Sequence, residues 1–381
     1  MDALKIGIVG MGVQGKLYAA MLAGELPGLP RPDSCRLSAV CTGNSAVGEV
    51  YAAKGVCVYD TWQEMLCGDD CDAVIITVPH YLHTQIAEFA LDHGKHVLCE
   101  KPAGIRASDV KAMLAAHRRN PGTALGMILN QRTNPLFRQL IEIVDSEELG
   151  TLRRSNWIIN SWWRPDRYYA GGAWRGTWKG EGGGVVVNQL PHQLDLWLEL
   201  AGMPASLYAL NRNGAHRKIT VENDVTIVAS YPHGATGVLV SCTHDPLGTD
   251  RLELDFDKGK IVVDNSAKAT VYRFKASETE WNRTLTHMEL PRMNREEGLL
   301  WEKEEITASQ PMGMAYIEIF TNFAAHVLRG EPLIADGQAG LRQVQLANAI
   351  QLSGWKNAPV CVPCDEAEFN AELQKRIDSE T

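Results

Sequence analysis

The chain has 381 residues, of which 45% are hydrophobic and 22% are charged. This composition is typical of a globular protein with a buried core, and it excludes a largely disordered chain. With 37 basic and 46 acidic residues the formal net charge is -9, which argues against a nucleic-acid partner because such surfaces carry a basic surplus. No apolar run approaches the roughly 20 residues of a membrane helix, and the N-terminus does not resemble a signal peptide.

The nine cysteines are an odd number, and four of them lie among apolar neighbours: Cys35, Cys41, Cys57 and Cys99. We therefore expect reduced, buried thiols in a cytoplasmic protein, and no disulfide framework. Cys361 and Cys364 form a single CxxC pair, but no second pair of cysteines or histidines accompanies it. The sequence predicts no metal site.

The first 130 residues alternate short apolar runs with helical stretches, which predicts a parallel sheet flanked by helices. Strands are expected over 4–9, 37–41, 73–78, 96–99 and 124–129. Helices are expected over 14–23, 84–92 and 108–117, with Ser108 as the N-cap of the last. We assign residues 1–130 to this domain.

Residues 131–381 form the second predicted domain, in which β-rich segments with short turns indicate an antiparallel sheet. Strands are expected over 152–162, 206–211, 225–231, 236–243, 251–256, 260–263 and 270–274. Helices are expected over 135–145, 189–200, 315–328 and 340–353, followed by a polar tail.

A glycine motif follows the first predicted strand and opens the first predicted helix: Gly10, Met11, Gly12, Val13, Gln14 and Gly15. Glycines at these positions allow a tight turn, close approach of the backbone to a pyrophosphate, and close helix–strand packing. The N-terminus of the helix supplies amide donors and the positive end of its dipole. The motif predicts a dinucleotide site formed by Gly10, Gly12, Val13, Gln14 and Gly15.

The end of the second predicted strand carries Thr42, Gly43 and Asn44, where an acidic residue would bind the 2′-hydroxyl of the adenosine ribose. The missing acid permits NADP, but the next basic residue is Lys54, so no cation is available nearby for a 2′-phosphate. Both NAD and NADP remain open, with NAD favoured, and Thr42, Gly43 and Asn44 are predicted to contact the cofactor.

Two further motifs are more specific: Thr77-Val78-Pro79-His80-Tyr81-Leu82-His83 and Gly94-Lys95-His96-Val97-Leu98-Cys99-Glu100-Lys101-Pro102. Together with the glycine motif and a C-terminal run (Tyr316, Phe320, Phe323, Gly330-Glu331-Pro332, Asp336-Gly337), the chain resembles the glucose-fructose oxidoreductase / inositol dehydrogenase / MocA family over nearly its whole length. The resemblance implies a Rossmann domain followed by an α/β domain with an open, mainly antiparallel sheet, used for assembly into a homodimer or homotetramer. Residues of the two motifs are expected at the cofactor: Pro79, His80, His83, Glu100 and Lys101.

The resemblance implies that Lys101 lies between nicotinamide and substrate. An ammonium group at that point stabilises the developing alkoxide of a reacting hydroxyl. The alternative is a lysine at a strand end whose side chain merely extends to water. Because Pro102 ends the strand at the carboxyl edge, where ligands of such sheets bind, we favour the catalytic role.

A glycine run, Gly182 to Gly184, precedes Asn188 and His192. Family members often carry Asp, three residues and His here, so the resemblance implies His192 as the general base, while Asn188 departs from the pattern. Asn188 is either a catalytic-site residue or simply the N-cap of the helix. His192 then lies in the first turn, where the helix dipole disfavours imidazolium and keeps the ring able to accept a proton. Asp195 either orients His192 or binds backbone.

Half of the ten tryptophans fall between residues 157 and 178, interleaved with arginines. Aromatic rings pack on the C–H faces of sugars and arginines donate to hydroxyls; an internal packing cluster is the equal alternative. The predicted substrate-binding residues are Trp163, Arg164, Tyr168, Trp174, Arg175, Asn188 and His192. The nearby glycines would allow the segment to move as a lid.

We therefore expect an NAD(P)-dependent oxidoreductase that oxidises a secondary hydroxyl of a sugar, polyol or glycoside, with hydride passing to nicotinamide C4. The catalytic residues would be Lys101, His192 and Asn188. The alternative is redox-assisted cleavage of a glycoside through a transient ketone, with retained NAD. A third hypothesis, a non-catalytic ligand sensor of the same fold, is favoured by Asn188 but disfavoured by the intact Lys101 and His192.

Overall fold

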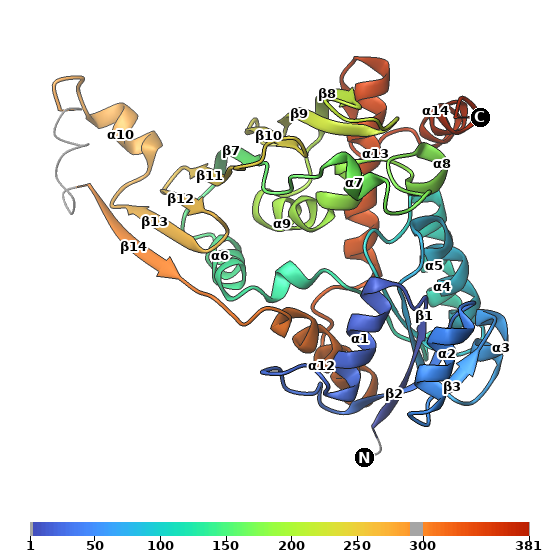
Figure 1. The fold of residues 1–381 in the computed structure, drawn as a ribbon. Coiled ribbons are helices and arrows are strands. Elements are labelled where there is room, and N and C mark those ends of the chain that lie inside the picture. The colour runs from blue at the N-terminus through green and yellow to red at the C-terminus, as the bar shows by residue number, and fades with distance from the viewer. Residues whose placement is uncertain (1–2, 290–299, 381) are drawn as a thin grey trace. The chain divides into compact units, whose positions relative to one another are not determined.

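The computed structural model describes residues 3–289 and 300–380. The chain forms two compact units, each assembled from separate stretches of sequence (Figure 1). The first unit comprises residues 1–133, 179–182 and 310–348, and the second comprises 134–178, 183–309 and 349–381. Each unit is described by itself below.

The first unit is built on a parallel sheet of six strands in the order β3-β2-β1-β4-β5-β6. The strands are β1 (Leu4–Val9), β2 (Cys35–Cys41), β3 (Cys57–Tyr59), β4 (Ala73–Ile76), β5 (His96–Cys99) and β6 (Leu125–Met127). This order is that of the dinucleotide-binding Rossmann fold. The predicted α/β class and parallel sheet are confirmed.

Helices cover both faces of this sheet: α1 (Val13–Ala23), α2 (Ser45–Ala52), α3 (Trp62–Cys67), α4 (His83–Asp92), α5 (Ala107–Arg119) and α12 (Met314–Arg329). Apolar side chains of α3, α4 and α5 share one core with one set of strand residues, and those of α1 and α12 share the other core. Successive strand residues alternate between the cores, so that Ile8 belongs to one and Val9 to the other. The strands are therefore buried on both sides, as their continuous apolar runs predict.

Helix α12 belongs to the first unit although it lies far along the sequence. The Phe320 ring packs edge-on against Tyr18 of α1, with centroids 5.0 Å apart, and Phe323 is 1% exposed. The C-terminal aromatic positions noted in the sequence thus complete the core beneath the glycine motif.

The second unit contains a sheet of nine strands in the order β14-β13-β12-β11-β7-β10-β9-β8-β15. The strands are β7 (Leu152–Ile159), β8 (Ser206–Asn213), β9 (Glu222–Ser230), β10 (Thr236–Cys242), β11 (Asp250–Phe256), β12 (Gly259–Asp264), β13 (Lys268–Phe274), β14 (Trp301–Thr307) and β15 (Val360–Cys361). Only the pairing of β7 with β10 is parallel; the other pairings are antiparallel. The expected open, mainly antiparallel sheet is confirmed.

One face of this sheet is covered by α9 (Pro191–Ala201), whose Trp197 donates from Nε1 to Ser155 Oγ of β7 at 2.7 Å. The remaining helices outside the first unit are α6 (Pro135–Asp145), α7 (Asp166–Tyr169), α8 (Trp178–Glu181), α10 (Glu278–Thr284), α13 (Gly337–Lys356) and α14 (Glu366–Asp378), with α8 and α13 contributing residues to both units. The expected polar tail has secondary structure, because residues after 359 add β15 to the sheet and form α14.

The predicted N-cap of α5 is also wrong. The cap is Arg106, and the first helical amide, that of Ala107, donates to the side chain of Asn348 at 3.0 Å. The Ser108 hydroxyl instead donates to Asp109 Oδ1 at 3.2 Å. A residue 241 positions away has taken the capping role, which no local pattern reveals.

All nine cysteines are free thiols. Cys35, Cys41 and Cys99 are buried as expected, but Cys57 is exposed at the start of the short edge strand β3, which corrects that expectation. Burial raises the pKa of Cys35 to about 12 and that of Cys41 to about 11. In the residues described, no helix has the length and apolarity needed to cross a membrane.

Candidate functional site

The glycine motif forms the turn from β1 into α1. Gly10 has φ +98°, a conformation that favours glycine, and the Thr77 hydroxyl donates to its carbonyl oxygen at 2.5 Å. Gly12 is the N-cap of α1 and offers no side chain to the first-turn amides. Val13 is 89% exposed. The helix therefore begins with backbone donors that face outward at the carboxyl edge of the sheet.

The three glycines differ in what a β-carbon would meet. At Gly15 a Cβ would lie 2.0 Å from the Gly10 carbonyl oxygen, so only glycine permits the close approach of α1 to the turn. At Gly12 a Cβ would meet no atom within 4 Å. The turn is thus closed on the protein side and open on the outer side, which fits a pyrophosphate lying against the backbone at Gly12.

The end of β2 carries the residues predicted to contact the adenosine ribose. Asn44 caps α2 by accepting from Val47 N at 3.2 Å, and the Thr42 hydroxyl oxygen accepts from Asn44 N at 3.2 Å. Gly43 and Asn44 are exposed. Lys54, the next basic residue, pairs with Glu25 at 2.7 Å, so its charge is already compensated.

The ends of β4 and β5 are joined by His83, the first residue of α4, which is 1% exposed. Its Nδ1 lies 2.7 Å from the carbonyl oxygen of Pro102, and its Nε2 lies 2.8 Å from that of Val78. Burial lowers the pKa of His83, and the two carbonyl contacts oppose that shift. His83 thus fixes two stretches of backbone. One is at Val78, after β4, and the other is at Pro102, which directly follows Lys101.

Glu100 and Tyr18 connect the lysine motif with α1. The Tyr18 hydroxyl donates to Glu100 Oε1, and Glu100 Oε2 accepts from the backbone amide of Lys101 at 3.0 Å. Burial raises the pKa of Tyr18 well above its ordinary value, and it also raises the pKa of Glu100. Both Glu100 and His83, predicted at the cofactor, therefore direct polar atoms into the protein.

His80 likewise contacts the protein, with Nδ1 3.0 Å from the carbonyl oxygen of Glu181. Pro79 is exposed and Lys101 is half-buried. In the first unit, the predicted residues therefore gather at the carboxyl ends of β1, β2, β4 and β5, where open parallel sheets bind ligands.

In the second unit, the glycine run ends in a single π-helical turn, Val185–Gln189, before α9. At Gly184 a Cβ would lie 1.8 Å from the Glu222 carbonyl oxygen, and the Gly184 amide donates to Glu222 Oε1 at 2.9 Å. Wide turns of this kind recur at functional sites. Glycine at position 184 is therefore required by close packing against β9.

Asn188 lies inside the π turn and does not cap α9, which corrects one of its two interpretations. The N-cap is Leu190, because Pro191 occupies the first helical position, where its missing N–H is tolerated. The regular α-helical spacing consequently does not extend from Asn188 to His192. His192 is half-buried at the second helical position, and Asp195 is 1% exposed.

Tyr168, on α7, gathers several of the predicted substrate residues. Its hydroxyl oxygen accepts from Arg175 Nη1 at 2.6 Å and lies 3.5 Å from the amide nitrogens of Asn188 and Gln189. The guanidinium of Arg175 lies 4.6 Å, and that of Arg164 4.9 Å, from the centre of the Tyr168 ring. Arg164, Tyr168, Arg175 and Asn188, which are not adjacent in sequence, thus form one group, called the arginine–tyrosine cluster below.

The tryptophans of this stretch have divided roles. Trp157 and Trp178 are 1% and 3% exposed, so they are core residues. For these two, the interpretation as a packing cluster holds. Trp174 lies beneath the Arg175 guanidinium at 4.4 Å, and Trp163 is 47% exposed. The segment expected to act as a lid is attached to the rest of the second unit. Asn160, Arg164 and Tyr169 form hydrogen bonds with residues in β10 or shortly after it.

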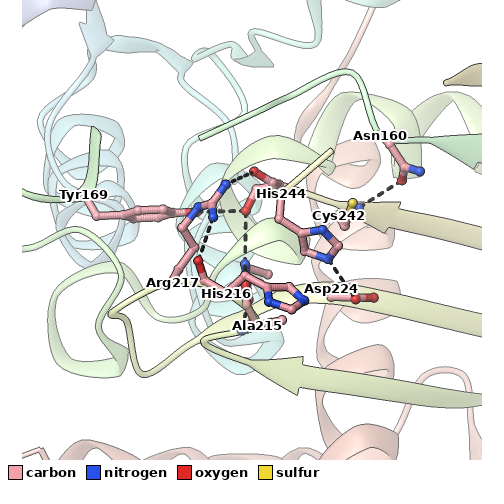
Figure 2. A network of polar contacts seen from close by, with 10 residues as sticks. Asn160, Tyr169, Ala215, His216, Arg217, Asp224, Cys242 and His244 are labelled. Carbon is pink, nitrogen blue, oxygen red and sulfur yellow. Dashed lines mark hydrogen bonds and ion pairs between the residues drawn. The ribbon is translucent and has the colours of Figure 1, made fainter. Parts of the chain in front are cut away.

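Sequence reasoning missed a polar network that supports the cluster from the sheet side (Figure 2). Arg217 donates to the carbonyl oxygens of Arg164, His216 and Thr243, and His244 Nε2 lies 3.0 Å from Asp224 Oδ2. No sequence pattern indicated this network, because its members are isolated polar residues in loops. Among the residues described, His, Cys, Asp and Glu side chains form no group of three suited to a metal ion.

Sequence comparison identifies two parts of one family. The "Oxidoreductase family, NAD-binding Rossmann fold" matches residues 4–125, and the "GFO/IDH/MocA C-terminal domain" matches residues 137–262. Together these matches cover more than half of the chain.

Individual relatives are distant. The uncharacterized oxidoreductase YrbE of Bacillus subtilis is 25% identical over 272 residues, 70% of this chain and 75% of that protein. Inositol 2-dehydrogenase of Salmonella typhimurium is 30% identical over 147 residues, 39% of this chain and 43% of that protein. The chain thus matches less than half the length of that characterised dehydrogenase.

Among solved structures, the WlbA dehydrogenase from Bordetella pertussis, in complex with NADH and UDP-GlcNAcA, superposes with a TM-score of 0.76. It is 24% identical, and the alignment covers 96% of this chain and 100% of that one. This likeness concerns the fold. From the two family matches and the two sheets, we conclude that the chain belongs to the Gfo/Idh/MocA oxidoreductase family, with its NAD-binding Rossmann fold and C-terminal domain.

Proposed function

We propose that this protein is an NAD(P)-dependent dehydrogenase that oxidises a secondary hydroxyl of a carbohydrate-like substrate. The observation that carries the proposal is the turn at Gly10, Gly12 and Gly15, which is closed to a β-carbon within the protein and open outside it. Such a turn has a clear use in binding a pyrophosphate and little use in a protein without a dinucleotide. Inositol 2-dehydrogenase among the relatives supports a polyol or sugar as substrate.

In the proposed reaction, bound nicotinamide would accept the hydride. Side chains of the protein accept the proton and stabilise the negative charge on the reacting oxygen. His192 accepts the proton of the reacting hydroxyl as general base. The Lys101 ammonium stabilises the negative charge that develops on that oxygen. His83 and Glu100 hold the backbone around Lys101 through the Pro102 carbonyl and the Lys101 amide. Asn188 contributes a neutral amide and does not take the proton.

NAD is the proposed cofactor in preference to NADP. The Asn44 side chain, at the end of β2, already accepts the Val47 amide. The Lys54 ammonium, which could have attracted a 2′-phosphate, is paired with Glu25. A 2′-phosphate would therefore gain no free cation from this lysine.

The test is product analysis by mass spectrometry after incubation with NAD, and separately with NADP, against sugars, polyols, sugar acids and glycosides. A product two hydrogens lighter than its parent, with stoichiometric reduced nicotinamide, supports the proposal. Aglycone release without net reduced nicotinamide would replace it with redox-assisted cleavage. Binding of a ligand with no chemical change in any member of the panel would favour the sensor hypothesis.

We also propose that the protein assembles as a homodimer or homotetramer through the outer face of the nine-stranded sheet. On the face opposite Trp197, the side chains of Ile158, Leu210 and Val228 are 41%, 51% and 47% exposed. Apolar side chains from three strands of one sheet are typical of a subunit interface. Light scattering of the wild type and of Val228→Glu tests this; a wild-type monomer would refute it.

A further inference from the structure

The arginine–tyrosine cluster is rich in donors and poor in acceptors. Two guanidinium groups face the Tyr168 ring, so they lie no farther apart than the sum of their distances to its centre. In the described part of the second unit, neither Arg164 nor Arg175 has a carboxylate oxygen within 4.0 Å. Arg164 Nε is buried and has no hydrogen-bond partner there.

The hydroxyl oxygen of Tyr168 is already used as an acceptor. It receives Arg175 Nη1 at 2.6 Å, and the Asn188 and Gln189 amides lie 3.5 Å away. The proton of Tyr168 remains a donor toward any further partner. The cluster therefore presents two cations and a phenolic O–H, and no described carboxylate oxygen of this unit lies within 4.0 Å of either guanidinium.

Polar contacts made by Arg217 and Thr243 fix the backbone of the cluster, and Figure 2 shows Arg217 with the neighbouring Tyr169. The Arg164 amide donates to the Thr243 carbonyl at 2.8 Å, and Arg217 donates from Nε to the Arg164 carbonyl. Next to Tyr168, the Tyr169 hydroxyl lies 3.1 Å from Thr243 Oγ1. The backbone that carries both the Arg164 guanidinium and the Tyr168 ring is thus fixed before a ligand arrives, which lowers the entropic cost of binding.

A sugar hydroxyl both donates and accepts, so sites for neutral sugars need acceptors as well as donors. A carboxylate or phosphate accepts only, and guanidinium groups match both in geometry and charge. Two neighbouring guanidinium groups without a counter-ion also repel each other, and an anion removes that repulsion. We infer that the substrate carries an anionic group, a carboxylate or a phosphate, which binds between Arg164 and Arg175. This inference rests on the proposed function and specifies its substrate class.

The experiment is calorimetric titration of the NADH-loaded protein with a matched set: D-glucose, D-glucuronate and D-glucose 6-phosphate. Turnover of the same set with NAD is followed in parallel. We expect at least tenfold tighter binding of one anionic sugar than of D-glucose, and a Kd that rises with salt. Whether D-glucuronate or D-glucose 6-phosphate gains distinguishes a carboxylate from a phosphate.

Three variants localise the effect. Arg164→Gln and Arg175→Gln are each expected to weaken the anionic ligand by tenfold to a hundredfold, as loss of a hydrogen bond to a charged group does, and to weaken D-glucose by a smaller factor. Arg167→Gln, at an exposed arginine next to Tyr168 on α7, is the matched control and should change neither. Circular dichroism and NADH binding verify that each variant is folded.

The outcomes separate this inference from the proposed function. Anionic preference that is lost in both arginine variants supports the inference, even when no product forms and the dehydrogenase proposal fails. Oxidation of D-glucose with equal or better binding than the acids overturns the inference while leaving the dehydrogenase intact. An anionic preference that survives in both variants, or no binding by any of the three ligands, also overturns it.

Discussion

The two candidate regions of this molecule are made in different ways. In the first unit the turn at Gly10–Gly15 is formed by backbone, and what matters at each position is the absence of a side chain. In the second unit the arginine–tyrosine cluster is formed by side chains that come from separate segments and are fixed by Arg217. Backbone sites follow from a few consecutive residues, whereas side-chain sites depend on the tertiary fold. The expected effects of mutation differ accordingly.

The largest effect is expected within the backbone site itself. Gly15→Ala places a Cβ 2.0 Å from the Gly10 carbonyl, so α1 must move away from the turn. We expect the free energy of unfolding to fall by about 3 kcal/mol or more and NADH binding to be lost. Urea denaturation and NADH fluorescence titration measure the two effects.

Gly12→Ala is the matched control, because Gly12 has φ −73° and open space around it. Stability should change by no more than about 0.5 kcal/mol, while NADH affinity falls at least tenfold because the methyl group occupies the path of the pyrophosphate. Equal NADH binding by Gly12→Ala and wild type would show that the turn is not a dinucleotide site.

The next effect tests whether each unit supplies one catalytic group. Lys101→Met in the first unit and His192→Gln in the second should each lower kcat by about 10² to 10⁴, the usual contribution of such groups. Both variants should still bind NADH. Steady-state kinetics and NADH titration measure the two quantities. Full activity in either variant would remove that residue from the mechanism.

A smaller effect is expected from the support of the side-chain cluster. Arg217→Met removes the donors to three carbonyl oxygens, and we expect a loss of about 2 kcal/mol in the free energy of unfolding. The KM for the substrate should rise about tenfold with kcat nearly unchanged, because Arg164 loses its fixed position. Lys218→Met, at the adjacent exposed lysine, is the control. A change in kcat alone would contradict a positioning role.

The last prediction is a pH dependence, and it concerns the core of the first unit in alkaline solution. Burial raises the pKa of Cys35 to about 12 and those of Cys41 and Cys71 to about 11, whereas the unfolded chain loses these protons near pH 9. The unfolded state therefore binds fewer protons in this interval. The free energy of unfolding should fall as pH rises above about 9, by about 1.4 kcal/mol per pH unit for each thiol.

Denaturation midpoints between pH 7 and 10.5 measure this dependence. The slope should be reduced in Cys71→Ala, and Cys67→Ala, which removes an exposed thiol, is the control. An unchanged slope in Cys71→Ala would show that this thiol does not titrate on unfolding.

The same contrast between local and distant contacts explains which parts of the fold can be predicted from the sequence. The strands β1 and β5 and helix α6 are predicted with their correct limits, because apolar runs and local capping determine them. The cap of α5 is not, because Asn348 provides it from a distant position. The π turn at Asn188 is also missed, since the sequence predicts a regular α-helix from residue 189 onward.

The same contrast explains which residues of the candidate site can be predicted from the sequence. Gly10, Gly12 and Gly15 are recognised within six residues of sequence. The grouping of Tyr168 with Arg175 and Asn188 was expected only as a shared role, and their contacts required the fold. Arg217 gave no signal, because a lone arginine in a loop is indistinguishable in sequence from any exposed one.

The placement of α12 has a consequence for the order in which the protein is made. Both cores of the first unit contain residues from the last quarter of the chain, Phe320 and Phe323 on one face and Ala339 and Val344 on the other. A ribosome that has released the six parallel strands has not yet released these side chains. The apolar faces they cover stay open while residues 134–309, most of the β-rich unit, are synthesised, so the first unit cannot complete its cores when its last parallel strand has left the ribosome.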